Sequence, residues 1–363
     1  MRDRVLSRIR SQGPMPFDTF MEMSLYDPDD GFFAAGAVRP GEDADFVTSP
    51  EVSPWFGRLI GRWVLAGQGE DLDGLSQTTL VEIGGGSGSL LEPLVEEIGE
   101  VLGQVVAIEV SDAARRSIAD RVPVAKVAAS LDDVQLSRNG VVVVNEVLDN
   151  LPTRLVKRST DSWEELCVGE VNGGLDLVTV TADAALAAWC DRWLGSVPVG
   201  TVLTAQMRMA DWIRHVLSWF ETAAVLVIDY AAPTSDLAMR RSEDVVRSFF
   251  RQQSGHDMFI DPGSTDVTVD VNIDVVTGLA DDMDLEMTVA TQREFLLDQG
   301  AADVLEKLGE TSHERARVGD VMGQLVARSE ATGLRALLDP SGLGGFTVFS
   351  ISKRDSALDW PTT

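Results

Sequence analysis

Short apolar runs recur along the chain from residue 79 onward, and segments of helical period lie between them. TLVEI (79–83), QVVAIEV (104–110), VVVVN (141–145) and AAVLVIDY (223–230) have the length and β-branched content of buried strands. A weaker strand is expected near 123–127, and LLEPLVEEIGEVLG and DAARRSIADRV predict helices between the first strands. Buried strands that alternate with helices predict a parallel, doubly wound sheet of the α/β class.

Other regions interrupt this alternation. Residues 1–75 contain helical patterns separated by loops rich in proline, glycine and aspartate, which predicts a helical N-terminal extension or lid. WEELCVGEVNGGLDLVTV (163–180) predicts a β-hairpin that turns at Asn172, inside an insertion at about 155–215. GFTVFSISK (345–353) predicts a last strand.

Four parts are therefore expected. They are the N-terminal helical extension (1–75), a Rossmann-like core (76–235), an inserted substrate or lid subdomain (236–335) and a C-terminal strand (336–363) that completes the core sheet.

Composition narrows the class of protein. With 44% hydrophobic and 24% charged residues, the 363-residue chain has the composition of a folded globular protein. No apolar run approaches the roughly 20 residues that span a bilayer, and the start MRDRVLSRIR lacks the apolar segment of a secretory signal. Cys167 and Cys190 lie far apart and the three histidines are isolated, so we expect a cytoplasmic protein with reduced thiols and no metal site.

The chain is strongly acidic. Its 58 acidic and 30 basic residues give a formal net charge of −28, which repels nucleic acid and anionic membranes and attracts a basic partner. We therefore expect neither nucleic acid nor membrane as a partner. An alternative of equal weight is that the acids serve solubility alone, and self-association is left open.

The richest candidate site is the loop Glu82-Ile83-Gly84-Gly85-Gly86-Ser87-Gly88, which directly follows a predicted strand and precedes a helix. Glycines there let the backbone turn tightly and approach a ligand. The dinucleotide fingerprint G-x-G-x-x-G fails because its third position is Ser89 or Leu91, and no Gly-Lys-Ser/Thr follows to make a phosphate loop.

An acid followed by G-x-G-x-G, with Gly84, Gly86 and Gly88, resembles motif I of the Rossmann-like methyltransferases, which bind S-adenosyl-L-methionine (SAM). Glu109 ends the next strand, about 20–25 residues further on, where such folds hold ribose hydroxyls with an acid. The alternative for Glu109 is a solvated acid at a strand end.

Several blocks together resemble the MidA-type methyltransferases, a family that includes the mitochondrial arginine methyltransferase that assists complex I assembly. They are FDTFMEMSLYDPDDGFF (17–33), DFVTSPE (45–51), EIGGGSGSL (82–90), IEVSDAAR (108–115), NEVLDNLP (145–152), DPGSTDVTVDVN (261–272), TQREFLLDQG (291–300) and DPSGLGGFTVF (339–349). The resemblance covers nearly the whole chain. It implies a class I methyltransferase sheet and SAM as cofactor.

The same resemblance assigns residues. Glu82, Gly84, Gly86, Gly88 and Glu109 would bind the cofactor. Asn145, Glu146 and Asp149 would line the transfer site as catalytic residues, and Thr48, Ser49, Glu51, Asp266 and Asp270 would belong to the substrate site or lid.

The chain departs from the family at a few positions. Gly85 stands where many members have proline or alanine, and Asn150 where alanine is usual. Asp270 and Asn272 stand where histidine and aspartate are typical, which bears on the substrate rather than on the cofactor.

The acids suit methyl transfer to a guanidinium. A carboxylate pair can grip that cation bidentately, localise its charge and accept the proton it loses. Glu146 and Asp149 follow the predicted strand 141–145, at the sheet edge where ligands bind in open α/β folds. Asp149 could instead cap a short helix. Asp229 and Tyr230 could face the same cleft, or simply end their strand.

Three functions remain open from sequence. The first is methylation of an arginine side chain in a protein partner. The second is methylation of a small molecule, which the altered 266–272 block keeps open. The third is a SAM-binding assembly factor with little turnover, whose acidic surface docks a basic partner.

Overall fold

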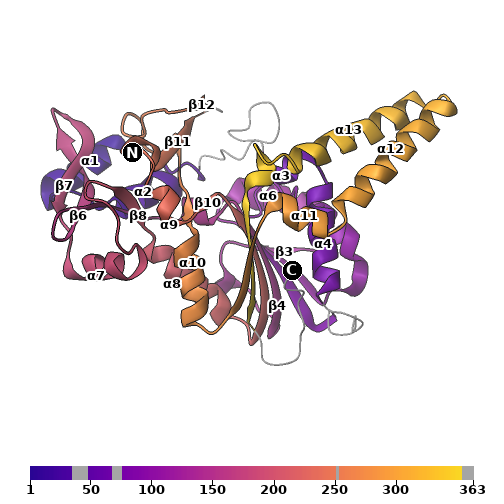
Figure 1. Ribbon diagram of the computed structural model, residues 1–363, viewed down its shortest axis with the longest axis horizontal. Helices are drawn as coiled ribbons and strands as arrows, with labels where there is room; N and C mark the ends of the chain where they lie inside the picture. The colour runs from indigo at the N-terminus through magenta and orange to yellow at the C-terminus, as the bar shows by residue number, and fades with distance from the viewer. Residues whose placement is uncertain (35–47, 68–75, 251–252, 354–363) are drawn as a thin grey trace.

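A seven-stranded mixed sheet forms the centre of the computed structural model, which describes residues 1–34, 48–67, 76–250 and 253–353 (Figure 1). Its strand order is β15-β16-β9-β4-β1-β2-β3. Five neighbouring strands run parallel, whereas β16 is antiparallel to both β9 and β15. The strands are β1 (Thr78–Ile83), β2 (Gln104–Ile108), β3 (Lys126–Ala128), β4 (Asn139–Asn145), β9 (Thr222–Asp229), β15 (Glu286–Thr291) and β16 (Thr347–Lys353). The predicted Rossmann-like α/β sheet is confirmed.

Helices cover both faces of this sheet, so its central strands are buried on both sides. In β1, Leu80 packs into one hydrophobic cluster and its neighbour Val81 into the other, as the alternation of a strand requires. One layer contains α4 (Trp55–Ala66), α5 (Leu91–Ile98), α6 (Asp112–Arg121) and α11 (Gln292–Asp298), and the other contains α8 (Met207–Ser218) and α10 (Ile273–Asp282). No helix among the described residues combines the length and apolar composition needed to cross a membrane.

A smaller antiparallel sheet, ordered β7-β6-β5-β8, lies beside the core (Figure 1). Its strands are β5 (Arg154–Arg158), β6 (Trp163–Val171), β7 (Gly174–Thr181) and β8 (Val202–Ala205). The predicted hairpin turns at Asn172 and Gly173, whose φ angles of 52° and 79° are those of a tight two-residue turn. Helices α1 (Arg2–Gln12) and α2 (Phe17–Tyr26) pack on this sheet, and α7 (Ala184–Trp193) packs against it in a separate cluster.

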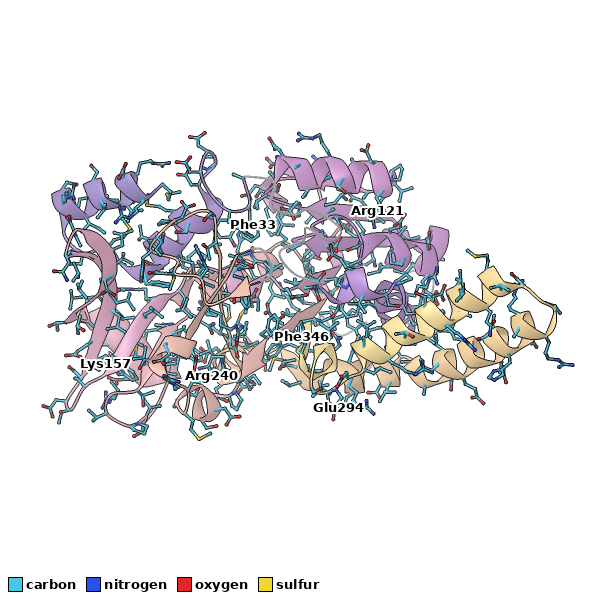
Figure 2. All side chains as sticks on the ribbon, turned by 90° about the horizontal axis from the view of Figure 1, so that it is seen from above. Phe33, Arg121, Lys157, Arg240, Glu294 and Phe346 are labelled. Atoms are coloured by element: carbon cyan, nitrogen blue, oxygen red, sulfur yellow. The ribbon has the colours of Figure 1, made fainter. Side chains whose placement is uncertain are left out.

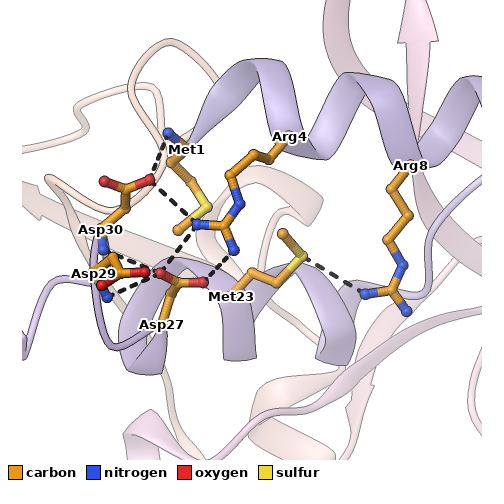
Figure 3. A network of polar contacts seen from close by, with 7 residues as sticks. All are labelled: Met1, Arg4, Arg8, Met23, Asp27, Asp29 and Asp30. Atoms are coloured by element: carbon orange, nitrogen blue, oxygen red, sulfur yellow. Dashed lines mark hydrogen bonds and ion pairs between the residues drawn. The ribbon is translucent and has the colours of Figure 1, made fainter.

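A polar network ties the start of the chain to the end of α2 (Figure 3). Arg4 donates to Asp27 at 2.6 Å and to Asp30 at 3.3 Å, and the amino group of Met1 also contacts Asp30 at 3.3 Å. The Arg4 guanidinium lowers the pKa of Asp27 to about 2. After this turn the chain returns along α2, because the N–H of Phe33 donates to the Leu25 carbonyl at 3.1 Å.

A third, three-stranded sheet is ordered β12-β11-β13 and comprises β11 (Val246–Phe250), β12 (Gln253–Ser254) and β13 (Asp266–Val269). The short pair β10 (Ala231–Ala232) and β14 (Val271–Asn272) joins it to the core, with α9 (Thr234–Leu237) alongside. Further short helices are α3 (Ser49–Val52), η2 (Gly99–Val101), η3 (Leu131–Asp133), η4 (Leu148–Asn150), η5 (Ser242–Asp244) and η6 (Leu343–Gly345).

The four parts expected from the sequence stay a prediction. In two of them, different elements belong to different sheets of the structure. Within 1–75, α1 and α2 cover the small sheet whereas α4 covers the core. Within 236–335, β11 to β13 form the third sheet whereas β15 and α10 belong to the core. Helices α12 (Ala301–Arg317) and α13 (Val321–Leu337) form a hairpin that extends away from the body in both views (Figures 1 and 2).

Candidate active site

A cavity of about 840 Å³ opens at the carboxyl ends of β1, β2 and β4. Its floor is the glycine loop, the end of β2 and the segment after β4. Its other walls come from α2 and the following turn, α3, α8, and the strands β11 and β13. Phe33 of this wall lies between the small-sheet side, marked by Lys157, and the core side, marked by Arg121 (Figure 2). This is the sheet edge at which open α/β folds bind ligands.

The glycine loop has a conformation that explains its spacing. Gly84, Gly86 and Gly88 have φ angles of 76°, 52° and 79°, a region that side chains with a Cβ rarely adopt, whereas Gly85 does not. A Cβ on Gly84 would lie 2.4 Å from Val147 Cγ2. Gly84 and Gly86 line the cavity; Gly88 is not among its lining residues and forms a turn, with its N–H donating to the Gly85 carbonyl at 2.8 Å.

Two buried acids stand beside this loop. Glu109 accepts hydrogen bonds from the N–H groups of Gly86 at 3.0 Å and Ser111 at 2.8 Å, which fixes its carboxylate at the cavity wall. Glu82 Oε2 is buried without a hydrogen-bond partner, and burial, with the nearby Glu109, raises its pKa to about 8. The loop therefore presents one ordered carboxylate and one unsatisfied carboxyl oxygen to the cavity region.

Glu146 is held in an unusual backbone conformation. Its φ of 52° is one of three positive values among the described non-glycine residues, and its N–H donates to the Ile228 carbonyl at 2.9 Å. Such a conformation costs on the order of 1–3 kcal/mol and is concentrated at functional sites. Asn145 Nδ2 donates to Glu146 Oε1 at 3.0 Å, while Asn145 Oδ1 is buried without a partner. Burial, followed by Asp149, raises the pKa of Glu146 to about 8.

Asp149 is buried beside Glu146 and also lines the cavity. Its Oδ1 has no hydrogen-bond partner, and burial together with Asp229 raises its pKa well above the ordinary value. It does not cap η4. Asp229 does so, because Asp229 Oδ2 accepts from the N–H groups of Leu148 at 2.9 Å and Asp149 at 3.3 Å. The pKa of the fully buried Asp229 is raised to about 8 by burial.

Of the three residues that the sequence assigned to the N-terminal lid, two line the cavity and one is buried in a contact between helices. Thr48 and Glu51 line the cavity, and burial raises the pKa of Glu51. Ser49 is fully buried and donates to Gln292 Oε1 at 3.0 Å, which joins α3 to α11. Residues 45–47 of the same block lie outside the described residues.

The residues of the 266–272 block also differ in whether they line the cavity. Asp266 lines the cavity and accepts from Asn150 Nδ2 at 2.9 Å, so the unusual Asn150 fastens β13 to η4. Asp270 is not among the residues that line the cavity; it is buried in ion pairs with Arg240 and Arg247. Asn272 caps α10 by accepting from the N–H of Asp274 at 3.0 Å. Asp270 therefore reaches the cavity through Arg247, and its expected place in the substrate site or lid stays a prediction.

Several cavity residues were not predicted from sequence. Arg247 lines the cavity, held by Asp270, with its guanidinium 5.1 Å from the centre of the Tyr230 ring. The other additions are an aromatic set and a second arginine, namely Tyr26, Phe32, Phe33, Trp212, Phe249 and Arg208. Tyr26, Phe32 and Phe33 lie within the 17–33 block, although no role was assigned to them, whereas Arg208, Trp212 and Phe249 lie outside all the blocks that resemble the family. Within the described ranges, no group of three or more histidine, cysteine or acidic residues could hold a metal ion.

Residues 59–291 match the protein family described as "Putative S-adenosyl-L-methionine-dependent methyltransferase". The chain belongs to this family. It is a SAM-dependent methyltransferase, as the glycine loop and the MidA-type blocks predicted.

Relatives of this methyltransferase support the assignment. "Protein arginine methyltransferase NDUFAF7, mitochondrial" of Mus musculus is 25% identical, over 88% of this chain and 79% of the relative. The protein of the same name from Xenopus laevis is also 25% identical, over 96% and 83%. A crystal structure from Burkholderia thailandensis with bound S-adenosyl-homocysteine is 25% identical, with a TM-score of 0.81, and the match covers 99% of this chain and 93% of that one.

The residues of the methyltransferase cavity fit SAM. The positive φ angles of Gly84 and Gly86 leave a cradle free of Cβ atoms, where a ligand can approach the backbone. Each Glu109 oxygen keeps a lone pair for a ribose hydroxyl after accepting one backbone N–H. The unsatisfied oxygens of Glu82 and Asn145 can accept from an ammonium group. These individual roles stay predictions.

Proposed function

We propose that this methyltransferase transfers the methyl group of SAM to a guanidinium nitrogen of an arginine side chain in a partner protein. The observation that carries the proposal is the convergence of Glu146, Asp149, Asp266 and Glu51 on the cavity that also contains the glycine loop. The printed names of the relatives, which specify protein arginine methyltransferases, point the same way.

The electrostatics of these acids favour a cationic acceptor. Asp149, Asp266 and Glu51 each raise the pKa of Glu146, after the larger effect of burial. Burial, these three acids and the hydrogen bond from Asn145 are the main influences on the pKa of Glu146, so they include no counter-charge for it, although Arg247 lowers the pKa of the neighbouring Asp149. A guanidinium supplies that charge, because it stays protonated in water and its fork of donors matches carboxylate geometry.

Each residue has a distinct task in this mechanism. Bound SAM would supply an electrophilic methyl group, whose bond to sulfur breaks as the bond to nitrogen forms, so that S-adenosyl-homocysteine is the leaving group. Glu146, held by its backbone conformation and by Asn145, orients the guanidinium. Asp149 Oδ1, which has no other partner, accepts a second N–H and then the proton released when nitrogen gains the methyl group. Tyr26, Phe33 and Tyr230 give the cavity aromatic walls that exclude water.

The proposal is tested by incubating the protein with isotope-labelled SAM and an extract of source cells that lack the gene, followed by mass spectrometry of the labelled products. We expect labelled methylarginine in a protein with the wild type and none with Glu146→Gln, which should still bind SAM. Label in a small-molecule fraction or on another residue would favour a different acceptor. If SAM binds but wild type transfers no label, an assembly factor with little turnover would replace the enzyme.

We also propose that the partner is a basic protein segment and that the chain acts in the cytoplasm. The net charge of −28 supports the first point, and the two cysteines, both buried and unpaired, support the second. Fractionation of the source cells, with the protein detected in a compartment other than the cytoplasm, would contradict the location.

A further inference from the structure

The α12–α13 hairpin is anchored to the body only through its base. Val304 and Leu308 of α12, with Leu334 and Leu337 of α13, belong to the main hydrophobic cluster. Glu330 of α13 accepts a hydrogen bond from Trp55 Nε1 at 2.9 Å and marks the limit of the base. In the distal half, from 309 to 329, Ser312 and Ala327 are the buried residues. At about 1.5 Å per residue, each helix of 17 residues is about 25 Å long, so the distal half projects well beyond the core.

This distal half exposes an apolar stripe. Val318, Val321, Met322, Leu325 and Val326 are between 53% and 77% exposed, and they are five of the eleven large hydrophobic side chains that the described residues leave exposed. Val321, Met322, Leu325 and Val326 have the spacing of one face of α13, and Val318 lies in the preceding turn; such a helix face normally packs against another helix. The stripe is exposed, so neither α12 nor the rest of the described body covers it.

The hairpin itself carries little net charge. Residues 301–337 contain six acidic and five basic residues, a net charge of −1, which leaves −27 on the rest of the chain. The hairpin is therefore a surface on which two copies of this acidic chain can meet with little repulsion. Among the described residues, no ion pair involves Glu310, Glu314, Arg317 or Arg328, which flank the stripe. When a two-fold axis relates two identical surfaces, the two acids of one copy can face the two arginines of the other.

We propose that the apolar stripe of α13 pairs with the same stripe of a second copy of this chain, so that two hairpins cross through a two-fold axis. The contact buries apolar side chains of both copies, brings the acids of one hairpin to the arginines of the other, and leaves both cavities open. This inference is independent of the acceptor proposed above.

At a protein concentration of about 100 µM, a dimer with a micromolar Kd is almost fully formed, so sedimentation equilibrium reports its mass. We expect wild type at twice the 39.2 kDa of one chain, Met322→Glu at 39.2 kDa, and the control Met239→Glu, at another exposed methionine, still at twice that mass. Circular dichroism confirms that each variant is folded. A wild type that sediments as one chain, or a Met322→Glu protein that still sediments as two, would overturn the proposal. The proposal would also be overturned if the wild-type protein sedimented as one chain and co-sedimented with anionic phospholipid vesicles, since the stripe would then bind lipid.

A cysteine cross-link tests the geometry separately, because Cys167 and Cys190 are both buried. Met322→Cys should form an intermolecular disulfide under mild oxidation, whereas Met239→Cys should remain reduced or react far more slowly. Equal cross-linking of the two variants would contradict pairing through the stripe.

Discussion

Replacing Glu146 by glutamine removes the carboxyl group whose pKa is raised from 4.5 to about 8, mainly by burial and next by Asp149. A rise of this size corresponds to at most about 5 kcal/mol against the ionised form. At pH 7 about nine in ten of these carboxyls then carry a proton, and at pH 9 about one in ten. A guanidinium that binds at Glu146 restores the ionised form. The ionisation of Glu146 should therefore contribute about 0.9 proton to the release at pH 7 and about 0.1 at pH 9.

The assay is calorimetric titration of a short peptide with one arginine into the protein saturated with S-adenosyl-homocysteine. Buffers of different ionisation enthalpy separate proton release from the heat of binding. Glu146→Gln should lose most of the release at pH 7, whereas Glu306→Gln, an exposed acid on α12, should match wild type. Binding by wild type without proton release at pH 7, or an unchanged release in Glu146→Gln, would refute the assignment of Glu146 to the guanidinium.

Three further changes have defined outcomes. Gly84→Ala should weaken SAM binding at least tenfold, because φ at Gly84 is 76° and the new Cβ would clash with Val147. The control Gly99→Ala, with φ 70° and open space around its Cβ, should lower stability by about 1–2 kcal/mol and leave the Kd for SAM unchanged. For Glu82, whose folded pKa of about 8 exceeds the ordinary 4.5, the folded protein keeps a proton that the unfolded chain loses, so stability falls by about 1.4 kcal/mol per pH unit between about pH 5 and 8. Glu146 and Asp229 add slopes of the same sign, so urea unfolding of Glu82→Gln should show a slope smaller than that of wild type by about 1.4 kcal/mol per pH unit, and parallel pH profiles of the two proteins would contradict this. Asn150→Ala should cost about 1–3 kcal/mol of stability and raise KM for the acceptor more than the Kd for SAM, because Asn150 fastens β13 to η4.

Much of the core could be predicted because its signals are local. Strands β1, β4 and β9 are buried along almost their whole length, so the sequence of each is a nearly continuous apolar run. Strand β15 lies at the sheet edge with residues only partly buried or exposed, so its sequence has no such run. Likewise, α1 and α2 reach the small sheet through contacts that join residues more than a hundred positions apart, which no local pattern encodes.

The candidate site shows the same division. The spacing of Gly84, Gly86 and Gly88 follows backbone conformation at those three positions, so the sequence carries it directly. The fate of Asp270 could not be inferred in this way. Asp266 and Thr268, two residues apart on β13, both line the cavity, whereas Asp270 follows the end of that strand and pairs with Arg240 and Arg247. A strand boundary and two distant arginines decide that outcome.

The capping of η4 is a similar case. Asp149 has the residue type and position of an N-cap, and sequence left that role open. The carboxylate of Asp229, from the neighbouring strand β9, accepts the N–H groups instead and leaves Asp149 Oδ1 free for a ligand. Only the parallel pairing of β4 with β9 brings the two acids together.

The central claim is that one cavity holds SAM at the glycine loop and the methyl acceptor at Glu146. The most direct test is calorimetric titration of SAM into wild type, Gly86→Val and Glu146→Gln, with folding checked by circular dichroism. The account predicts binding by wild type and by Glu146→Gln, and loss of binding by folded Gly86→Val, because φ at Gly86 is 52° and valine strongly disfavours that conformation. Unchanged binding by Gly86→Val, or its loss in Glu146→Gln, would contradict this division of the cavity.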